Sequence, residues 1–477
     1  MPEDIEKANE LSAKKSEFSN WYSQALQVAE IIDKRYNVKG MNVWMPYGYS
    51  IMMAIKKFWD DLFQKDGIKE MYFPLIVPLE YCEQNESWWE GFKNEAFWVK
   101  GLEEKKATHI LRSTGEPAMY PMFSIWIRSS NNLPFRIYET VSSFRYETSH
   151  TRPLIRDREI TVWHEIHTAH ESKEDAEDEA KKHEGFYDEI WEFLALPSIK
   201  VRKPQWEVFP GAVGAIEYYS LMPTGRVMEN GSINNLGQAY AKKFNIKFKN
   251  EKGKEDFVWQ ICTGNGARLL AGVIAVHGDD RGLVLPPNIA PIQAVIVPIY
   301  SKKDMDKVIK ECENVKKELE KECVRVHLDL RKEFPGSKFY DWEIKGVPLR
   351  IEIGSRDISQ KQVTVVRRDT LSKEAILNNE LKKIRTLLDQ IQNDLLKKAQ
   401  ENLDKHTKTA AMKTELEKKI KGNLVKVGWC GSGDCWDNIK EIAEGVELFG
   451  ADLKQKKGTC IICGKVSNEV GYVARTY

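Results

Sequence analysis

The sequence lacks an excess of charge of either sign. Its 72 Lys and Arg residues nearly balance its 71 Asp and Glu residues. Proteins that bind nucleic acids without sequence preference usually carry a clear basic excess. The balance therefore excludes a uniformly basic nucleic-acid-binding surface, and any contact with a nucleic acid must be local.

Long hydrophobic runs are also missing. The longest apolar stretch, near residues 289–300, contains two prolines and is shorter than the roughly 20 residues that a membrane-spanning helix needs. The first residues, Met-Pro-Glu-Asp, do not form the apolar core of a signal peptide. We therefore expect a cytoplasmic protein that does not enter a membrane.

Cysteine is scarce except near the end of the chain. Four of the eight cysteines crowd into two close pairs, Cys430 with Cys435 and Cys460 with Cys463. Four thiolates can close a tetrahedral zinc shell and leave no open position for catalysis. This pattern predicts a structural zinc site. Reduced, metal-free pairs are the alternative, and a redox-active pair fits less well because no strand-to-helix context surrounds Cys460.

The length of 477 residues indicates two or three domains. In the first half, helical spacing of apolar residues ends at Gly67, and a strand is predicted over residues 71–78. Its two prolines cannot donate to a ladder, so it should lie at a sheet edge. Further strands are predicted at 135–138, 141–145 and 160–165, and Ser172 is a candidate N-cap for a helix to about Leu196.

A boundary is predicted at Pro286–Pro287, because the pattern changes there. Strands then alternate with helices, which indicates a small α/β domain. From Ser372 to about Asp404 apolar residues form a helical stripe. We expect it to pack against the tail of the chain, with a short coiled coil as the alternative.

Arginines and carboxylates gather around Phe144–Glu147, the loop Arg152–Glu159, and the segment Trp163–His167. An Arg-x-Glu on a strand is by itself usually a surface pair. An arginine-rich loop between two strands, however, is suited to gripping a triphosphate, because planar guanidinium groups hold phosphate oxygens in a bidentate fork.

These residues resemble those of class II aminoacyl-tRNA synthetases, specifically the archaeal and eukaryotic type of prolyl-tRNA synthetase. The resemblance covers motif 1 at about 48–78, motif 2 at about 135–167, motif 3 at about 260–285, the segment Trp342–Gly354, and the four-cysteine tail. It implies an α+β fold with three parts. They are an antiparallel-sheet catalytic domain (1–287), an α/β anticodon-binding domain (288–375) and a small zinc-binding α+β C-terminal domain (376–477).

The resemblance also implies a ligase that uses ATP with Mg²⁺ to activate proline as an aminoacyl-adenylate, releases pyrophosphate, and transfers the amino acid to tRNA as a homodimer. Thr114 and Glu116 would hold the ammonium of the amino acid, and Arg145 would bridge its carboxylate and the α-phosphate. The remaining pocket residues implied are Trp163, Glu165, His167 and Asn234. The ATP-binding residues implied are Arg145, Glu147, Arg156, Glu229, Ser232, Cys262, Thr263 and Arg268.

Glu343, Arg350 and Lys373 match positions that read the anticodon in the family, although such residues are more often surface charges. Several pocket positions depart from the family pattern, namely Gly115, Glu229, Asn234, Ile261 and Thr263. Proline remains the expected substrate. The alternatives are a paralogue that activates a different small or more polar amino acid, because Thr263 and Asn234 would enlarge and wet the pocket, or a non-catalytic tRNA-binding protein.

Overall fold

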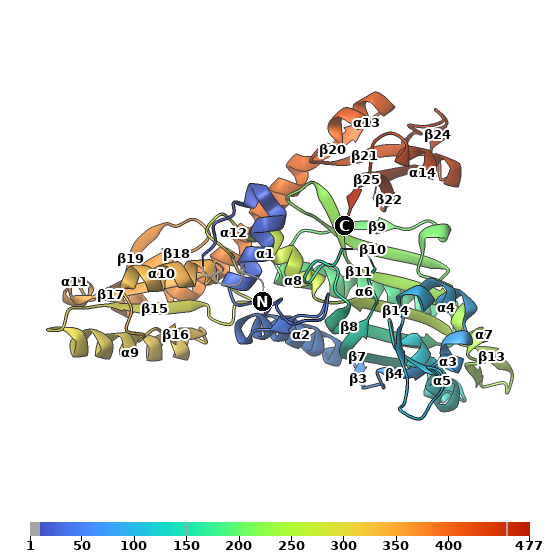
Figure 1. The fold of residues 1–477 in the computed structure, drawn as a ribbon, viewed down its shortest axis with the longest axis horizontal. Coiled ribbons are helices and arrows are strands. Elements are labelled where there is room, and N and C mark those ends of the chain that lie inside the picture. Colours follow the sequence, from blue (N-terminus) through green and yellow to red (C-terminus); the bar gives the residue numbers. More distant parts are fainter. Residues whose placement is uncertain (1–9, 149, 455–456) are drawn as a thin grey trace.

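The computed structural model describes residues 10–148, 150–454 and 457–477. A twisted eleven-stranded sheet dominates this part of the chain, and a separate five-stranded sheet lies at the other end of the molecule (Figure 1). The large sheet has the order β20 (Thr407–Ala410), β21 (Leu424–Trp429), β25 (Glu469–Thr476), β22 (Val446–Asp452), β9 (Ile199–Arg202), β10 (Gly214–Leu221), β11 (Arg226–Gly237), β14 (Trp259–Asn265), β8 (Glu159–His170), β7 (Phe135–Phe144) and β3 (Lys69–Glu70).

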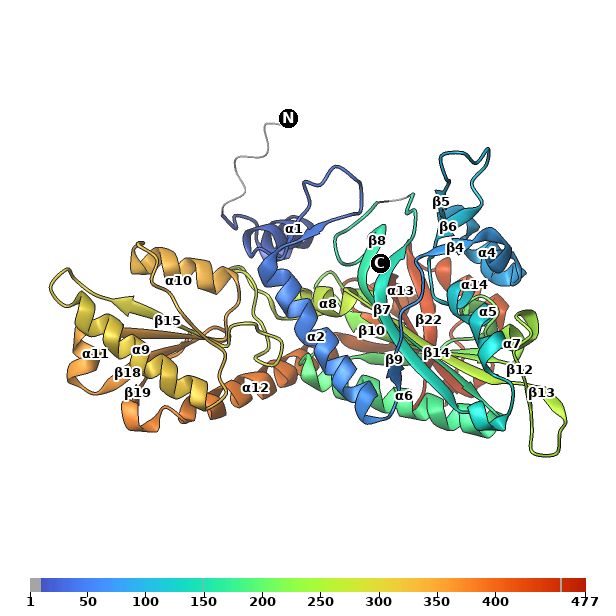
Figure 2. The ribbon, with the colours of Figure 1, turned by 90° about the horizontal axis from the view of Figure 1, so that it is seen from below.

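The strands from β9 to β7 pair antiparallel, as the family resemblance implies for the catalytic part. One face of this sheet is covered by α2 (Pro46–Lys65), α6 (Lys173–Phe193) and α8 (Arg268–His277), whose apolar residues join those of the strands in the largest core (Figure 2). Ser172 caps α6 as predicted, because its side chain accepts a hydrogen bond from the Asp175 N–H.

A second core lies on the opposite face. It packs α4 (Glu86–Phe92), α5 (Glu116–Trp126) and α7 (Ala239–Lys243) against the sheet, beside a three-stranded sheet of β4 (Ile76–Pro78), β6 (His109–Leu111) and β5 (Phe97–Val99). The other short elements are α1 (Phe18–Val28), α3 (Leu79–Glu83), β1 (Ile32–Asp33), β2 (Val43–Trp44), β12 (Lys247–Lys249), β13 (Glu255–Phe257), β23 (Gly458–Thr459) and β24 (Val466–Ser467).

The single strand predicted over residues 71–78 is wrong. Only its last three residues form a strand, β4, which begins at Ile76, and β3 ends before the segment, at Glu70. Pro74 in the linking stretch has no N–H to donate, and the Phe73 N–H goes to the Glu139 carboxylate instead, at 3.2 Å. The predicted edge position holds for the part that is a strand, because β4 lies at the edge of the three-stranded sheet and pairs there with β6. The strands predicted at 135–138 and 141–145 are one strand, β7, with a register irregularity after Val141.

The five-stranded sheet has the order β16 (Val326–Leu328), β15 (Ala294–Ile299), β17 (Leu349–Gly354), β18 (Gln362–Arg367) and β19 (Lys373–Leu377), with α9 (Met305–Lys321), α10 (Pro335–Ile344) and α11 (Ser355–Ser359). The predicted helix from Ser372 begins later, as α12 (Lys383–His406), because its first residues form β19. The apolar stripe of α12 packs into the core of this unit and not against the tail, so that expectation is wrong.

The tail continues the large sheet. β22 pairs with β9, and β25 runs parallel to the first residues of β11. Two short helices, α13 (Lys413–Lys419) and α14 (Gly433–Lys440), complete it. Within the described ranges, the helices are all too short or too polar to span a lipid bilayer.

Candidate active site

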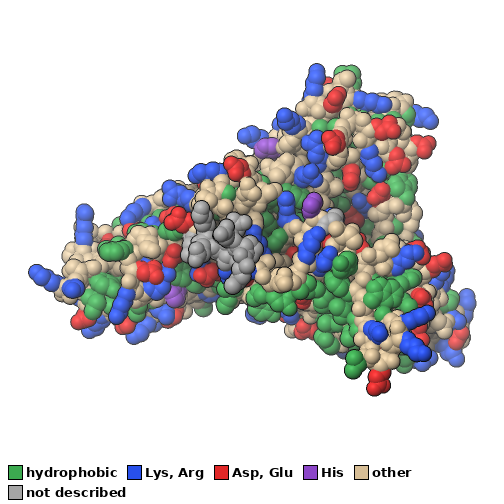
Figure 3. All heavy atoms as spheres, in the orientation of Figure 1, with side chains coloured by type: hydrophobic (Ala, Val, Ile, Leu, Met, Phe, Trp, Pro, Cys, Tyr) green, Lys and Arg blue, Asp and Glu red, His purple; other side chains and the backbone are tan. Residues whose placement is uncertain are grey.

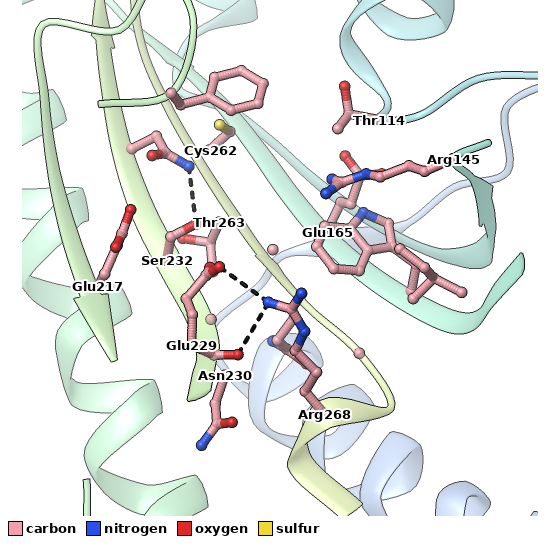
Figure 4. A pocket seen from close by; sticks show the side chains of 18 of the residues that line it. Thr114, Arg145, Glu165, Glu217, Glu229, Asn230, Ser232, Cys262, Thr263 and Arg268 are labelled. Carbon is pink, nitrogen blue, oxygen red and sulfur yellow. Dashed lines mark hydrogen bonds and ion pairs between the residues drawn. The ribbon is translucent and has the colours of Figure 1, made fainter. Parts of the chain in front are cut away.

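Every residue predicted for the amino acid and for ATP lies on one cavity of about 260 Å³. The cavity opens on the sheet face that carries α5, and β8, β10, β11 and β14 form its floor. The structure therefore brings together residues that are far apart in the sequence, as Figure 4 shows for ten of the lining residues. The predicted residues on the cavity are Thr114, Glu116, Arg145, Glu147, Arg156, Trp163, Glu165, His167, Glu229, Ser232, Asn234, Cys262, Thr263 and Arg268.

One end of the cavity is built for a cation. Glu116, the first residue of α5, is almost fully buried and accepts a hydrogen bond from the Thr114 hydroxyl. That hydroxyl in turn accepts from the Trp88 indole N–H at 2.9 Å. Burial and the nearby charge of Glu165 raise the pKa of Glu116. A cationic group beside Glu116 would offset this cost of burying a carboxylate.

Glu165 and His167 are held on β8, directly behind this end. One carboxylate oxygen of Glu165 accepts from the Gly115 backbone N–H and lies 2.9 Å from His167 Nε2. His167 Nδ1 lies 2.9 Å from the Tyr120 hydroxyl. Burial opposes a charged imidazole, but the hydrogen bond to Glu165 and the charges of Glu116 and Glu165 outweigh it and raise the pKa of His167.

A buried ion pair that the sequence analysis missed supports these residues. Arg112 and Glu139 are both inaccessible to solvent, with Nη1 and Oε1 2.5 Å apart. Glu139 stands opposite Glu165 in the pairing of β7 with β8. If all five groups are charged, the three carboxylates exceed the two cations by one negative charge. An incoming ammonium group would neutralise it. The carboxylates are Glu116, Glu139 and Glu165, and the cations are Arg112 and a protonated His167.

Sequence alternation offered a signal for Glu139 but hardly any for its partner. Ile137, Glu139 and Val141 share one face of β7, so a buried carboxylate could have been inferred there. Arg112 sits just after the short strand β6, where no periodicity reveals burial. Glu217, a further cavity residue that was missed, faces Glu229 from β10.

The other end of the cavity presents guanidinium groups. Arg145 follows β7 and lies over the Trp163 ring, 5.7 Å from its centre. Arg268 begins α8, donates to the Ile155 carbonyl at 2.8 Å, and pairs with the Glu229 carboxylate at 3.1 Å (Figure 4). Burial and the charge of Arg268 lower the pKa of Arg145. Two guanidinium groups on one cavity, near enough to affect each other's charge, are suited to an anionic ligand such as a triphosphate.

Glycine is required beside Trp163. A Cβ on Gly264 would meet the Trp163 ring at 2.7 Å, so a larger residue would displace the indole on which Arg145 rests. The loop that carries Arg156 is anchored by buried Leu154 and Ile155. Arg156 itself lies 3.5 Å from the carboxylate of Glu147. Ser149, within the same loop, is outside the described residues.

Two of the five departures from the family pattern point away from the ligand. Ile261 and Thr263 share one face of β14, and Ile261 belongs to the core under α6. The Thr263 hydroxyl lies 2.9 Å from His183 Nδ1 of α6. Thr263 therefore does not add a polar side-chain wall to the amino-acid end. Asn234 does face the cavity, where its amide donates to the Ser232 hydroxyl.

Glu343, Arg350 and Lys373 are close together in the five-stranded unit. Arg350 lies 2.9 Å from Glu343 and 3.1 Å from Glu352, and Lys373 pairs with the other oxygen of Glu352. The three predicted residues thus form one charged network, in which Glu352 is the shared partner.

The four tail cysteines also come together. The sulfur atoms of Cys430, Cys435, Cys460 and Cys463 all lie within 4.8 Å of one another. They come from the end of β21, from α14 and from the turn after β23. Four thiols at this spacing are a donor set that fits tetrahedral Zn²⁺.

We predict that Arg112→Met lowers the free energy of unfolding of the catalytic part by about 3–5 kcal/mol, because it leaves Glu139 charged and buried without a partner. Adding Glu139→Gln should recover part of the loss. Arg35→Met, which removes an exposed ion pair with Asp33, is the matched control and should cost under about 1 kcal/mol. Calorimetric unfolding measures all three, and equal losses for Arg112→Met and Arg35→Met would contradict the prediction.

Comparison with known proteins assigns the three parts. Residues 97–277 match the tRNA synthetase class II core domain (G, H, P, S and T), 293–388 the anticodon binding domain, and 412–477 the prolyl-tRNA synthetase C-terminal domain. The chain is 42% identical to a proline–tRNA ligase of Thermococcus kodakarensis, over 96% of this chain and 98% of that one. It is 41% identical to that of Methanobrevibacter smithii, over 96% and 99%.

Among solved structures, prolyl-tRNA synthetase of Giardia lamblia in complex with prolyl-adenylate superposes with a TM-score of 0.94 at 33% identity, covering 98% of this chain and 99% of that one. The resemblance inferred from the motifs is thereby confirmed, as is the fold class. The chain belongs to the prolyl-tRNA synthetase family.

Proposed function

We propose that this protein is an aminoacyl-tRNA ligase that activates proline with ATP and transfers it to the 3′ end of tRNA. The observation that carries this proposal is the pairing, in one cavity, of a buried carboxylate end with a doubly guanidinium-lined end. Full-length relatives named proline–tRNA ligase support proline as the substrate. So does the structural neighbour that holds prolyl-adenylate.

The arrangement accounts for both ends of an amino acid. Thr114 and Glu116 bind the ammonium group, and Trp163, His167 and Asn234 bound the space beside it. Arg145 then meets the amino-acid carboxylate. That carboxylate attacks the α-phosphorus in line, a new C–O–P linkage forms, and the bond to pyrophosphate breaks. No protein nucleophile is needed, because Arg145 and Arg268 stabilise the charge that develops on the phosphate oxygens.

Glu147, Arg156, Ser232 and the backbone of Thr263 complete the proposed ATP-binding side. The side chain of Cys262, predicted for ATP, lies instead at the amino-acid end, with its sulfur 3.8 Å from Glu116. Mg²⁺ would neutralise the phosphates when bound. The carboxylates of Glu229 and Glu217 fit this ion, because both line the nucleotide side of the cavity (Figure 4). In the second step the tRNA hydroxyl attacks the activated carbonyl, AMP leaves with the electrons of the broken bond, and the hydroxyl proton passes to the departing phosphate or to solvent.

The two alternatives have less support. A paralogue with a wider, more polar pocket was inferred partly from Ile261 and Thr263, and the Thr263 hydroxyl bonds α6 instead of facing the ligand. Gly115 keeps the backbone N–H that orients Glu165. A non-catalytic tRNA-binding protein would have no need for Arg145 and Arg268 in one cavity with Glu116.

We propose that the catalytic part comprises residues 1–287 and that the anticodon-binding part begins at 288. The second boundary, expected at 375, fits better after α12, because the apolar stripe of that helix belongs to the core of the five-stranded unit. The tail then begins near β20. We also propose a cytoplasmic location, in keeping with a role in translation.

A homodimer through motif 1 is proposed as well. β3 ends the large sheet, and the stretch that follows exposes Tyr72 (71%) and Ile76 (49%), while Ile125 of α5 is 53% exposed. Figure 3 shows hydrophobic side chains gathered on the lower part of the molecule, around α2 and α5. Burying such a patch against a second copy would remove apolar surface from water.

We expect Arg145→Ala to lower the rate of ATP–pyrophosphate exchange with proline by roughly 10²–10³-fold or more, because the phosphate charge loses a preorganised donor. Arg128→Ala, which removes an exposed arginine outside the cavity, is the matched control and should leave exchange unchanged. Near-normal exchange in Arg145→Ala would remove this residue from the proposed mechanism.

Glu343 and Arg350, with Lys373, are proposed to read anticodon bases. Replacing Glu343 and Arg350 together by alanine should raise the KM for tRNA about tenfold, on the order of the discrimination that one good base contact provides, and leave proline activation alone. Arg356→Ala, an exposed arginine on α11, serves as the control in the same unit. A tRNA KM unchanged by the double replacement would show that the network is only surface charge.

The tail is proposed to hold one structural Zn²⁺ through Cys430, Cys435, Cys460 and Cys463. Cys435→Ser should lower the metal content of the purified chain by about one zinc ion and lower its Tm, because the closed four-thiolate shell is lost. Elemental analysis with thermal melting checks both effects. Cys323→Ser, an exposed thiol elsewhere, should change neither, and zinc content that Cys435→Ser leaves unaltered would refute the site.

A further inference from the structure

A second metal-binding constellation lies inside the catalytic cavity. Glu116, His167 and Cys262 each offer one ligand atom, and these atoms all lie within 4.8 Å of one another. All three residues are buried, and Cys262 Sγ is 3.8 Å from Glu116 Oε1. Within the described residues, this is the one such group besides the tail cysteines. Its mixture of sulfur, imidazole and carboxylate donors suits Zn²⁺ and similar thiophilic ions better than Mg²⁺.

His167 can offer a ring nitrogen to a metal once one of its two present contacts is released. Its Nε2 lies against the Glu165 carboxylate at 2.9 Å. A histidine that donates one ring N–H to a carboxylate can present the lone pair of its other nitrogen to a metal, and the carboxylate fixes the tautomer. That other nitrogen, Nδ1, is contacted by the Tyr120 hydroxyl. This hydroxyl would have to turn aside when an ion is bound.

The surrounding charge favours a cation. Glu116 and Glu165 both line the cavity, and Glu165 Oε1 is buried without a hydrogen-bond partner among the described residues. An unpaired buried carboxylate oxygen is costly. A divalent ion close to this oxygen would reduce that cost by more than a single ammonium group does.

We propose that Glu116, His167 and Cys262 form a binding site for a thiophilic divalent cation such as Zn²⁺, which excludes the amino acid from the cavity. Binding releases to solvent the thiol proton of Cys262 and, where His167 is protonated, the proton on its Nδ1, and it involves no change of oxidation state. Glu116 cannot serve the metal and the amino-acid ammonium at once, so the two ligands compete.

The test uses the full-length chain with its tail cysteines loaded with zinc, and Co²⁺ as the probe. Thiolate-bound Co²⁺ gives a charge-transfer absorption band. We expect a saturable band in the wild-type chain and in Cys312→Ser, which removes a buried thiol of α9 far from the cavity. Cys262→Ser should weaken Co²⁺ binding at least tenfold. A band of equal size and affinity in Cys262→Ser, or no band in the wild type, would overturn the proposal.

A second measurement needs no variant and guards against misfolding of Cys262→Ser. Saturating proline should suppress the Co²⁺ band of the wild-type chain. This competition rests on the proposed function. ATP–pyrophosphate exchange with proline is therefore measured on the same wild-type preparation before Co²⁺ is added. If exchange shows that proline is activated and the band nevertheless persists, competition is refuted. If the wild-type chain shows no exchange with proline before Co²⁺ is added, proline is not the substrate. The comparison of Cys262→Ser with Cys312→Ser would still test whether the site binds the ion.

Discussion

The active site depends on keeping several charges buried together at the end of β6 and on β7 and β8. Arg112 neutralises Glu139, and His167 contacts Glu165. Glu116 is buried and hydrogen-bonded to Thr114, without a cation paired to it in the described residues. Arg112 and Glu139 also hold the segment after β3, because the Phe73 N–H donates to the Glu139 carboxylate and the Arg112 backbone N–H donates to the Leu75 carbonyl. A shift of that edge would therefore disturb the amino-acid end, since uncompensated charge is costly at low dielectric.

Strand alternation separates two tasks on the same sheet. On β14, Cys262 faces the cavity while Ile261 and Thr263 face α6. On β8, Ile166 belongs to the core between Glu165 and His167 of the site. Because alternate residues of a strand face opposite sides of the sheet, a substitution on β8 or β14 affects either the ligand cavity or the packing of the helices, not both. The tail extends the same sheet through β22 and β25, which ties the four-cysteine cluster to the frame of the active site.

Local signals predicted part of this structure well. The Ser172 cap and the edge position of β4 follow from capping and proline chemistry. The antiparallel catalytic sheet and the proposed cavity residues, apart from Glu217, follow from the family resemblance. Other features depend on distant partners. The residues around Arg112 give no sign of its partner Glu139. The side of the sheet that Thr263 faces depends on where β14 begins and how it pairs. The surface against which α12 packs belongs to the five-stranded unit, whose core draws on strands from as far back in the sequence as β15. The motifs thus predicted which residues lie at the cavity, but not which way each side chain points.

The central claim is that the cavity recognises proline through its buried carboxylate end and activates it between two arginines. It is tested most directly by ATP–pyrophosphate exchange measured with the purified chain against every standard amino acid and a panel of cyclic proline analogues. The account predicts the highest kcat/KM for proline. A different preferred amino acid, or no exchange with any of them, would contradict it.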